Sequence, residues 1–361
     1  MRKNTERYFE SALHYFLPVT DTPEIDGFTL EFGKQYYYFR DKITPFNDTC
    51  SCSIADSKYC TNKLLQDAGL PVPKATAINA WQYQQGMLDE IIADLSFPLV
   101  AKPTADTAFG QDVLCNIKDK QQLINYLEKN LSKYSFISFE EFYGNLNSYR
   151  ILVFNYKVIG VIQRFPAQVS GDGVNNIAEL IRLENIKRPI EHEVLAPIVV
   201  DDECNIRLQE LGLTLEDVPT KGQKITLGYT CNSTRGGTFI ALANKLGRKN
   251  RKLMKAAAQV LNLNLVGFDL VCSDLMTPLQ ISGGVIIEAN SKPSIRIHEE
   301  ATQGRPHMVT RTIMRSFIFR HPLSYGVFLF KHPKTRIYAR TLLVSVIVGI
   351  IFALLGIGLK I

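Results

Sequence analysis

Apolar and polar positions along this chain follow a mixture of strand and helix periods. Alternating or continuous apolar runs predict strands at residues 28–32, 35–39, 97–102, 134–139, 149–154, 158–164, 266–271 and 285–289. Helical spacing predicts helices at residues 8–16, 57–68, 81–95, 121–130, 177–183, 204–211 and 249–261. Because hairpins and helices are mixed, the pattern favours an α+β fold with helices on one side of its sheets.

The end of the chain differs because it is apolar on every side. Residues 341–359 read TLLVSVIVGIIFALLGIGL, with no charge. A helix of that length spans about 28 Å, close to the hydrocarbon core of a bilayer. The preceding residues 331–340 carry four basic side chains, and such residues favour the cytoplasmic side. We therefore expect a single-pass C-terminal anchor at the membrane, with the rest of the chain in the cytoplasm; a buried core helix is the alternative.

Composition narrows the class of protein only a little. The 361 residues are 46% hydrophobic and 21% charged, which suits about two globular domains. A net charge of +6 leaves anionic substrates and lipids as partners, whereas no basic-aromatic repeat or zinc-finger spacing supports nucleic acid. The seven cysteines are scattered and predict free thiols in a reducing compartment. The N-terminus shows no pattern of a secretory signal.

Oxygen-bearing side chains gather at the ends of two apolar runs near the C-terminal third. Glu288 and Asn290 are two residues apart on a predicted strand and therefore point to the same face. Asp269 lies on a second apolar run, at 265–271, and can add a third oxygen. Buried acids are costly unless they are paired or metal-bound. This set predicts a site for Mg²⁺, of the kind that holds the phosphates of ATP.

Four further features are weak by themselves. Lys102 ends a buried strand and suits a phosphate, although most lysines are surface charges. The loop 104–113 is short of glycine for a phosphate-binding loop. The segment 139–142 leaves a strand and could meet an adenine edge. Arg150 and Arg164 lie at the outer ends of the predicted 149–164 hairpin, where they suit a phosphate or carboxylate, or else are solvated.

The order of these features resembles the ATP-grasp superfamily, most closely the ATP-grasp module of cyanophycin synthetases and bifunctional glutathione synthetases. The resemblance covers roughly residues 50–310. It rests on SK at 57–58, TNKLL at 61–65, GLPVP at 69–73, PLVAKP at 98–103, FEEFYG at 139–144, YRILV at 149–153, RFPAQVSGDG at 164–173, IAELI at 177–181, NSTRGGT at 232–238, VGFDLV at 266–271, IIEAN at 286–290 and SKPSIRIHEEATQG at 291–304.

The resemblance implies an ATP-grasp fold, with two α+β lobes that clasp ATP, and a role for each matching residue. It implies phosphate contacts for Lys58 and Lys102, and a linker between the lobes that begins at Glu140. Adenine would meet the backbone of Glu141 and Phe142. Asp269, Glu288 and Asn290 would hold two Mg²⁺ ions, with Mn²⁺ as a substitute. The residues that would face the acyl-phosphate or the substrates are Arg150, Arg164, Asn232, Arg235, Arg296 and His298, the last of which equally suits a packed structural histidine.

The activity implied is that of a carboxylate–amine ligase on an amino acid or short peptide, through an acyl-phosphate, with loop 104–113 as a lid. Related enzymes often form oligomers. Three departures stand out: Asp112 near the phosphate loop, the extra residues 145–148, and Ser294 after Pro293. They leave a non-catalytic ATP-binding scaffold or sensor at the membrane as the alternative.

We expect an N-terminal segment at 1–55, an ATP-grasp domain at 56–320, a basic juxtamembrane segment at 321–340 and the span at 341–359. The second catalytic domains of the two resembling enzymes are missing from this sequence, so a free-standing ligase module is expected.

Overall fold

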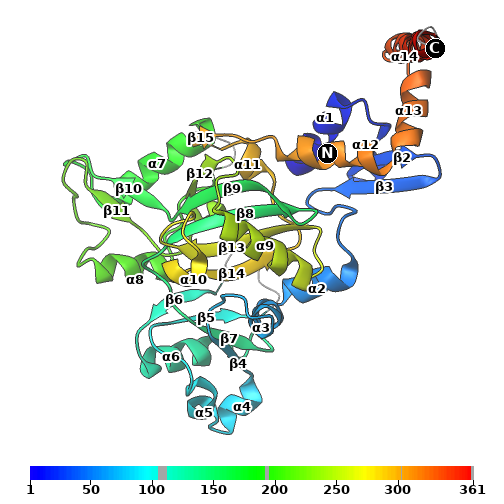
Figure 1. Ribbon diagram of the computed structural model, residues 1–361. Helices are drawn as coiled ribbons and strands as arrows, with labels where there is room; N and C mark the ends of the chain where they lie inside the picture. Colours follow the sequence, from blue (N-terminus) through cyan, green and yellow to red (C-terminus); the bar gives the residue numbers. More distant parts are fainter. Residues whose placement is uncertain (105–111, 192–194, 302, 359–361) are drawn as a thin grey trace. The chain divides into compact units, whose positions relative to one another are not determined.

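The computed structural model describes the chain except for residues 105–111, 192–194, 302 and 359–361 (Figure 1). The chain forms two compact units, one of residues 46–309 and the other of residues 1–45 together with 310–361. The domain boundaries expected from the sequence stay predictions, although residues 310–320 group with the N-terminal segment here.

A six-stranded sheet forms the centre of the 46–309 unit (Figure 1). Its order is β14-β13-β8-β9-β12-β15, from β8 (Asn147–Phe154), β9 (Lys157–Phe165), β12 (Thr238–Leu242), β13 (Leu265–Cys272), β14 (Val285–Asn290) and β15 (Gln303–Arg305). The turn between β8 and β9 uses Asn155 and Tyr156, both at positive φ, as a two-residue hairpin requires. One face packs on α2 (Thr49–Asp56), α3 (Lys58–Asp67) and α9 (Arg248–Val260) through residues such as Ile151, Val266 and Phe268.

A four-stranded antiparallel sheet carries the second lobe of this unit. Its order is β4-β7-β5-β6, from β4 (Ala75–Ile78), β5 (Leu99–Pro103), β6 (Leu114–Ile117) and β7 (Ile137–Glu141). Leu99, Ile137 and Phe139 form an apolar core with α6 (Lys120–Asn130) and the helices before β5. Every second residue of β5 and β7 therefore points away from this core, which leaves the opposite face for polar groups.

The helix predicted at residues 81–95 is wrong. The structure has two short helices instead, α4 (Ala80–Gln84) and α5 (Leu88–Ile92). Gly86 lies between them at φ +70°, a left-handed conformation that ends the first helix. A capping box of Asn79 and Gln82 fixes the start of α4.

A small layer between β9 and β12 in sequence has its own core. It contains β10 (Gln168–Ser170), β11 (Lys224–Thr226), α7 (Ile177–Glu191) and α8 (Asp202–Glu210). Val169, Ile177, Cys204 and Ile225 are among its buried residues. The remaining short elements of the unit are η2 (Ser233–Arg235), α10 (Leu279–Ser282) and α11 (Arg296–Glu299).

The second unit joins the two ends of the chain. A three-stranded sheet of β1 (Val19–Thr22), β2 (Gly27–Phe32) and β3 (Gln35–Arg40), with η1 (Pro23–Ile25) in the first turn, is covered by α1 (Lys3–His14) and α12 (Val309–Arg320). Aromatic rings fill its core. The ring centroid of Phe39 lies 4.7 Å from that of Phe28 and 5.3 Å from that of Tyr8, and Phe317 of α12 is fully buried. Two more helices follow, α13 (Pro322–Lys331) and α14 (Arg336–Gly358).

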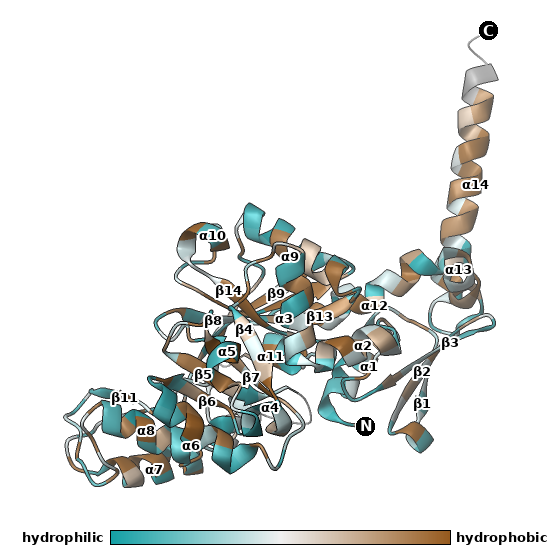
Figure 2. Cartoon of the chain, turned by 90° about the horizontal axis from the view of Figure 1, so that it is seen from below, coloured by the Kyte–Doolittle hydropathy of each residue, from teal (hydrophilic) through white to brown (hydrophobic). Residues whose placement is uncertain are grey.

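Helix α14 is long and apolar enough to cross a bilayer and has no buried part over its residues 336–355 (Figure 2). It begins five residues before the predicted span, and residue 359 of that span lies outside the described part of the chain. The exposure removes the alternative of a helix buried in the core of this chain, because no described residue covers it.

Candidate functional site

The free face of the six-stranded sheet carries a row of charged residues. Asp269 of β13 lies directly opposite Arg150 of β8 and Glu288 of β14. Gly267 lies opposite Asn290 and has no side chain, so none stands between the Asn290 amide and the charged residues. The register is continuous from Gly267 to Asp269 and shifts only after Asp269. The sheet thus brings Asp269, Glu288 and Asn290 to one face.

Two arginines neutralise Asp269. Arg150 forms a bidentate ion pair with its carboxylate, and Arg164 Nη1 lies 3.0 Å from Oδ2. Arg164 also donates to Ser148 Oγ at 3.1 Å. Burial would raise the pKa of Asp269, but the two guanidinium groups hold it below its usual value. The sequence predicted these arginines at the outer ends of the hairpin. In the structure they lie on the neighbouring strands β8 and β9, and both side chains contact Asp269.

The donor set of this row suits a magnesium ion. Two carboxylates and one amide offer oxygen atoms side by side, as a hard cation prefers. Glu288 and Asn290 are each partly exposed, whereas Asp269 is buried beneath the arginines. Among the residues that the structure describes, no group of three or more His, Cys, Asp or Glu side chains forms a metal site, so this mixed set is the candidate.

The second lobe offers a buried ion pair on its free face. Lys102 Nζ lies 2.6 Å from Glu140 Oε2, and the two residues are only 5% and 2% exposed. Glu140 lies inside β7 and not at the start of a linker, because β7 continues to Glu141. The backbone N–H groups of Glu141 and Phe142 donate to Lys74 and Pro98, so they are already engaged in the fold. Lys58 begins α3, and its N–H bonds to the carbonyl of Thr104 just beyond β5.

Charged groups of the site act on two cysteine thiols. Burial raises the pKa of Cys115 on β6; Glu203 raises it further, while Lys102 and Arg235 oppose this effect. Burial also raises the pKa of Cys231, which lies within the influence of Arg164, Glu203 and Asp269. Both thiols therefore lie within the electrostatic influence of Glu203 and of arginine side chains of the site.

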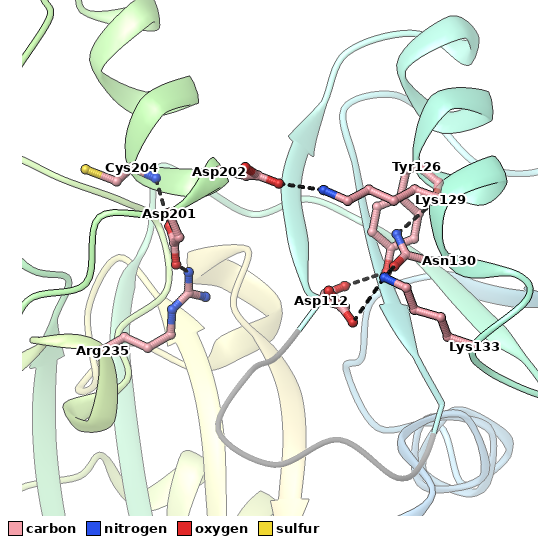
Figure 3. A network of polar contacts seen from close by, with 9 residues as sticks. All are labelled: Asp112, Tyr126, Lys129, Asn130, Lys133, Asp201, Asp202, Cys204 and Arg235. Carbon is pink, nitrogen blue, oxygen red and sulfur yellow. Dashed lines mark hydrogen bonds and ion pairs between the residues drawn. The ribbon is translucent and has the colours of Figure 1, made fainter.

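Glu203 organises the loop that carries Arg235. Its Oε1 accepts hydrogen bonds from the N–H groups of Tyr229 and Thr230, each at 2.9 Å. Its Oε2 lies 3.1 Å from Arg235 Nη1, and Asp201 forms a second ion pair with the same arginine (Figure 3). The sequence analysis missed Asp201 and Glu203, although the acidic run at 201–203 was a signal.

Asn232, predicted to meet substrate, caps the short helix η2. Its side-chain oxygen accepts from Thr234 N at 3.1 Å. It therefore shapes the same loop as Glu203 does.

Asp112 is turned toward α6 and the segment after it (Figure 3). Tyr134 donates to its carboxylate at 2.6 Å, and Lys133 lies 4.0 Å away. Asp112, which departs from the family pattern near the phosphate loop, is thus paired with side chains of its own lobe. The rest of the predicted lid, residues 105–111, lies outside the described residues.

The two residues expected at the acceptor side pack within the unit. Arg296 donates to Glu300 at 2.7 and 2.9 Å. His298 is 1% exposed and lies against Gly160, where an added Cβ would be 2.6 Å from its Nδ1. Burial, aided by Arg150 and His307, lowers the pKa of His298 to about 3. His298 is therefore a neutral, packed histidine, which was the alternative raised from the sequence.

Known proteins resemble this chain over most of its length. A family model described as a RimK-like ATP-grasp domain matches residues 55–184. Cyanophycin synthetase of Synechocystis is 32% identical over 291 residues, which cover 79% of this chain and 33% of that protein. The bifunctional glutathione biosynthesis protein GshAB of Mannheimia succiniciproducens is 26% identical over 330 residues, 87% of this chain and 42% of that protein.

The fold agrees as well. The crystal structure of a bifunctional glutathione synthetase from Pasteurella multocida superposes with a TM-score of 0.61 at 22% identity, over 89% of this chain and 44% of that one. The chain spans about a third of the length of the cyanophycin synthetases that it matches. The chain contains a RimK-like ATP-grasp domain and has the α+β ATP-grasp fold, with distant homology to the ATP-grasp regions of cyanophycin synthetase and GshAB.

Proposed function

We propose that this protein is an ATP-dependent carboxylate–amine ligase that acts on an amino acid or short peptide through an acyl-phosphate. The observation that carries the proposal is the row of Arg150, Asp269 and Glu288 on one sheet; Lys102 lies on the other sheet, on the face turned away from its apolar core. Family membership supports ATP as the nucleotide and amide formation as the reaction.

Each group then has a task in phosphoryl transfer. Glu288 and Asn290, with Asp269, would hold two Mg²⁺ ions, which would supply positive charge to neutralise the phosphates. Lys102 and Lys58 would bind the phosphate oxygens, and Glu141 and Phe142 would border the adenine through their remaining backbone and side-chain groups. Arg150 and Arg164, which pair with Asp269 here, would bind the oxygens of the acyl-phosphate.

The substrates would meet the loop that holds Arg235 and Asn232. Arg296 and His298, which pack within the unit, would act there only by shaping the acceptor side. The transferred phosphoryl group would end as inorganic phosphate, after an amine attacks the acyl carbon and ADP has formed. Exclusion of water protects the acyl-phosphate during this step.

We further propose that α14 anchors the protein in a membrane, with the ligase domain in the cytoplasm. The support is its length, the uncharged run that begins at residue 341, its exposure, and the basic residues in its first turns and just before it.

A second function, an ATP-binding scaffold without turnover, is favoured by one observation. The cations expected to meet phosphate or substrate are already paired: Lys102 with Glu140, and Arg235 with Asp201 and Glu203. A catalytic cycle must exchange these partners for ligand oxygens.

ADP release separates the two functions. The full chain in detergent is given Mg-ATP with pooled amino acids and dipeptides, beside Glu288→Ala and Glu90→Ala. Glu90 is an exposed carboxylate of α5 and serves as the control. A ligase gives pool-dependent ADP in the wild type and in Glu90→Ala, reduced by roughly a hundredfold or more in Glu288→Ala. ATP binding with no pool-dependent ADP would support the scaffold and overturn the ligase.

A further inference from the structure

The C-terminal part of the chain carries one sign of charge. Residues 301–361 contain nine lysines and arginines and no aspartate or glutamate. The chain as a whole has a net charge of only +6, so the rest of it is net acidic. Such asymmetry marks a segment that meets an anionic partner.

Exposed apolar side chains follow the same segment. Phe319, Leu323 and Val327 are 75%, 85% and 54% exposed, and they recur every four residues along α12 and α13. Arg311 and Arg315 precede them at the same spacing and are also exposed. Within each helix, residues four apart lie on one face, so each helix presents an outward stripe.

The inward side of these helices is fixed by contacts within the unit. Phe317 is buried against the aromatic core around Phe39, and Tyr37 bonds to His321 at 2.8 Å. Tyr325 donates to the carbonyl of Tyr15 at 2.7 Å. The exposed stripe therefore cannot turn inward without loss of these contacts.

The direction of α13 suits a surface rather than a span. Figure 1 shows α14 nearly along its axis above α13, whereas Figure 2 shows α14 lengthwise with α13 at its base, so the two helices run crosswise. The chain bends at His332, which has an extended conformation, before Pro333. If α14 crosses a bilayer, α13 lies along its face.

We propose that the outer face of α12 and α13 rests on an anionic phospholipid surface. Phe319, Leu323 and Val327 enter the interface between headgroups and acyl chains, and Arg311, Arg315 and Lys331 bind the headgroups. The proposal rests on the anchor proposed for α14, to which this face is continuous. Each basic residue near such a surface raises the affinity for the membrane about fivefold. Because α14 would already anchor the chain, the main effect of this segment would be to orient the protein on the membrane.

Depth-dependent quenching of tryptophan tests the proposal on the full chain. The sequence has one tryptophan, Trp81, so Trp81→Phe is a dark background. Leu323→Trp reports on the proposed face, Ile347→Trp on α14, and Ile281→Trp on an exposed apolar position of α10 as the control. Each is reconstituted in phosphatidylcholine vesicles with or without phosphatidylglycerol, brominated near the headgroup or at mid-chain.

We expect Leu323→Trp to be quenched best by bromine near the headgroup, Ile347→Trp by bromine at mid-chain, and Ile281→Trp by neither. Quenching of Ile347→Trp alone would support the anchor and overturn the surface proposal. Leu323→Trp with a blue-shifted emission but no quenching would also overturn it, because that result indicates a protein partner. If neither is quenched, the anchor fails as well. The headgroup contacts would be refuted if quenching of Leu323→Trp were the same with and without phosphatidylglycerol and were also unchanged by Arg311→Gln combined with Arg315→Gln.

Discussion

Removal of one partner from the Lys102–Glu140 pair should destabilise the small lobe strongly. Glu140→Gln leaves the ammonium group of Lys102 buried at 5% exposure without a counter-ion. Loss of one partner of a buried pair costs about 3–5 kcal/mol. In the double variant Lys102→Met with Glu140→Gln no buried charge is left, so most of this cost should be recovered.

Hydrogen exchange of peptides from β5 and β7 measures the effect where it arises. A loss of about 3–5 kcal/mol corresponds to exchange that is roughly a hundredfold to a few thousandfold faster when reclosing is fast, so that exchange follows the opening equilibrium. Asp67→Asn, which breaks the exposed pair with Lys63, is the control and should leave these peptides unchanged. Mg-ATP should restore part of the protection in Glu140→Gln, because phosphate would replace the lost carboxylate.

Two results would refute this reasoning. The first is unchanged exchange in Glu140→Gln, which would mean that the ammonium group is solvated in solution. The second is a double variant as unstable as the two single changes combined, since the pair would then contribute no coupling energy.

Three further changes test other contacts of the site. Gly160→Ala should cost about 1–3 kcal/mol of stability by overpacking against His298, measured by thermal unfolding, and His298→Ala should suppress that cost. The pKa of His298 is lowered to about 3, so its contribution to the free energy of unfolding is complete above the unfolded pKa of 6.5 and declines below it. At pH 5 the loss is about 2 kcal/mol. A His298→Gln variant whose free energy of unfolding changes with pH as in the wild type would contradict this. Glu203→Ala should leave the N–H groups of Tyr229 and Thr230 without their acceptor, so proteolysis between β11 and η2 should accelerate, by a factor that Glu90→Ala does not reproduce.

Local pattern was enough to predict the long strands and most of the long helices of the 46–309 unit, but it missed short elements such as β4, β6 and β12. The alternation at 285–290 placed Glu288 and Asn290 on one face, and the structure has them so. The helix at 81–95 failed because one residue, Gly86, adopts a conformation that outweighs the helical spacing around it.

The order of motifs along the chain determined the family, since each segment carries its own residue types. Tertiary structure alone decided the partners: Asp269 meets Arg150 and Arg164, Lys102 meets Glu140, and Arg235 meets two acids that the sequence analysis passed over. The physical reason is register. A strand pattern states which face a side chain takes, but the residue opposite it depends on how distant segments align. Asp269 and Arg150, for example, are 119 positions apart, and a shift of one residue would reverse every face.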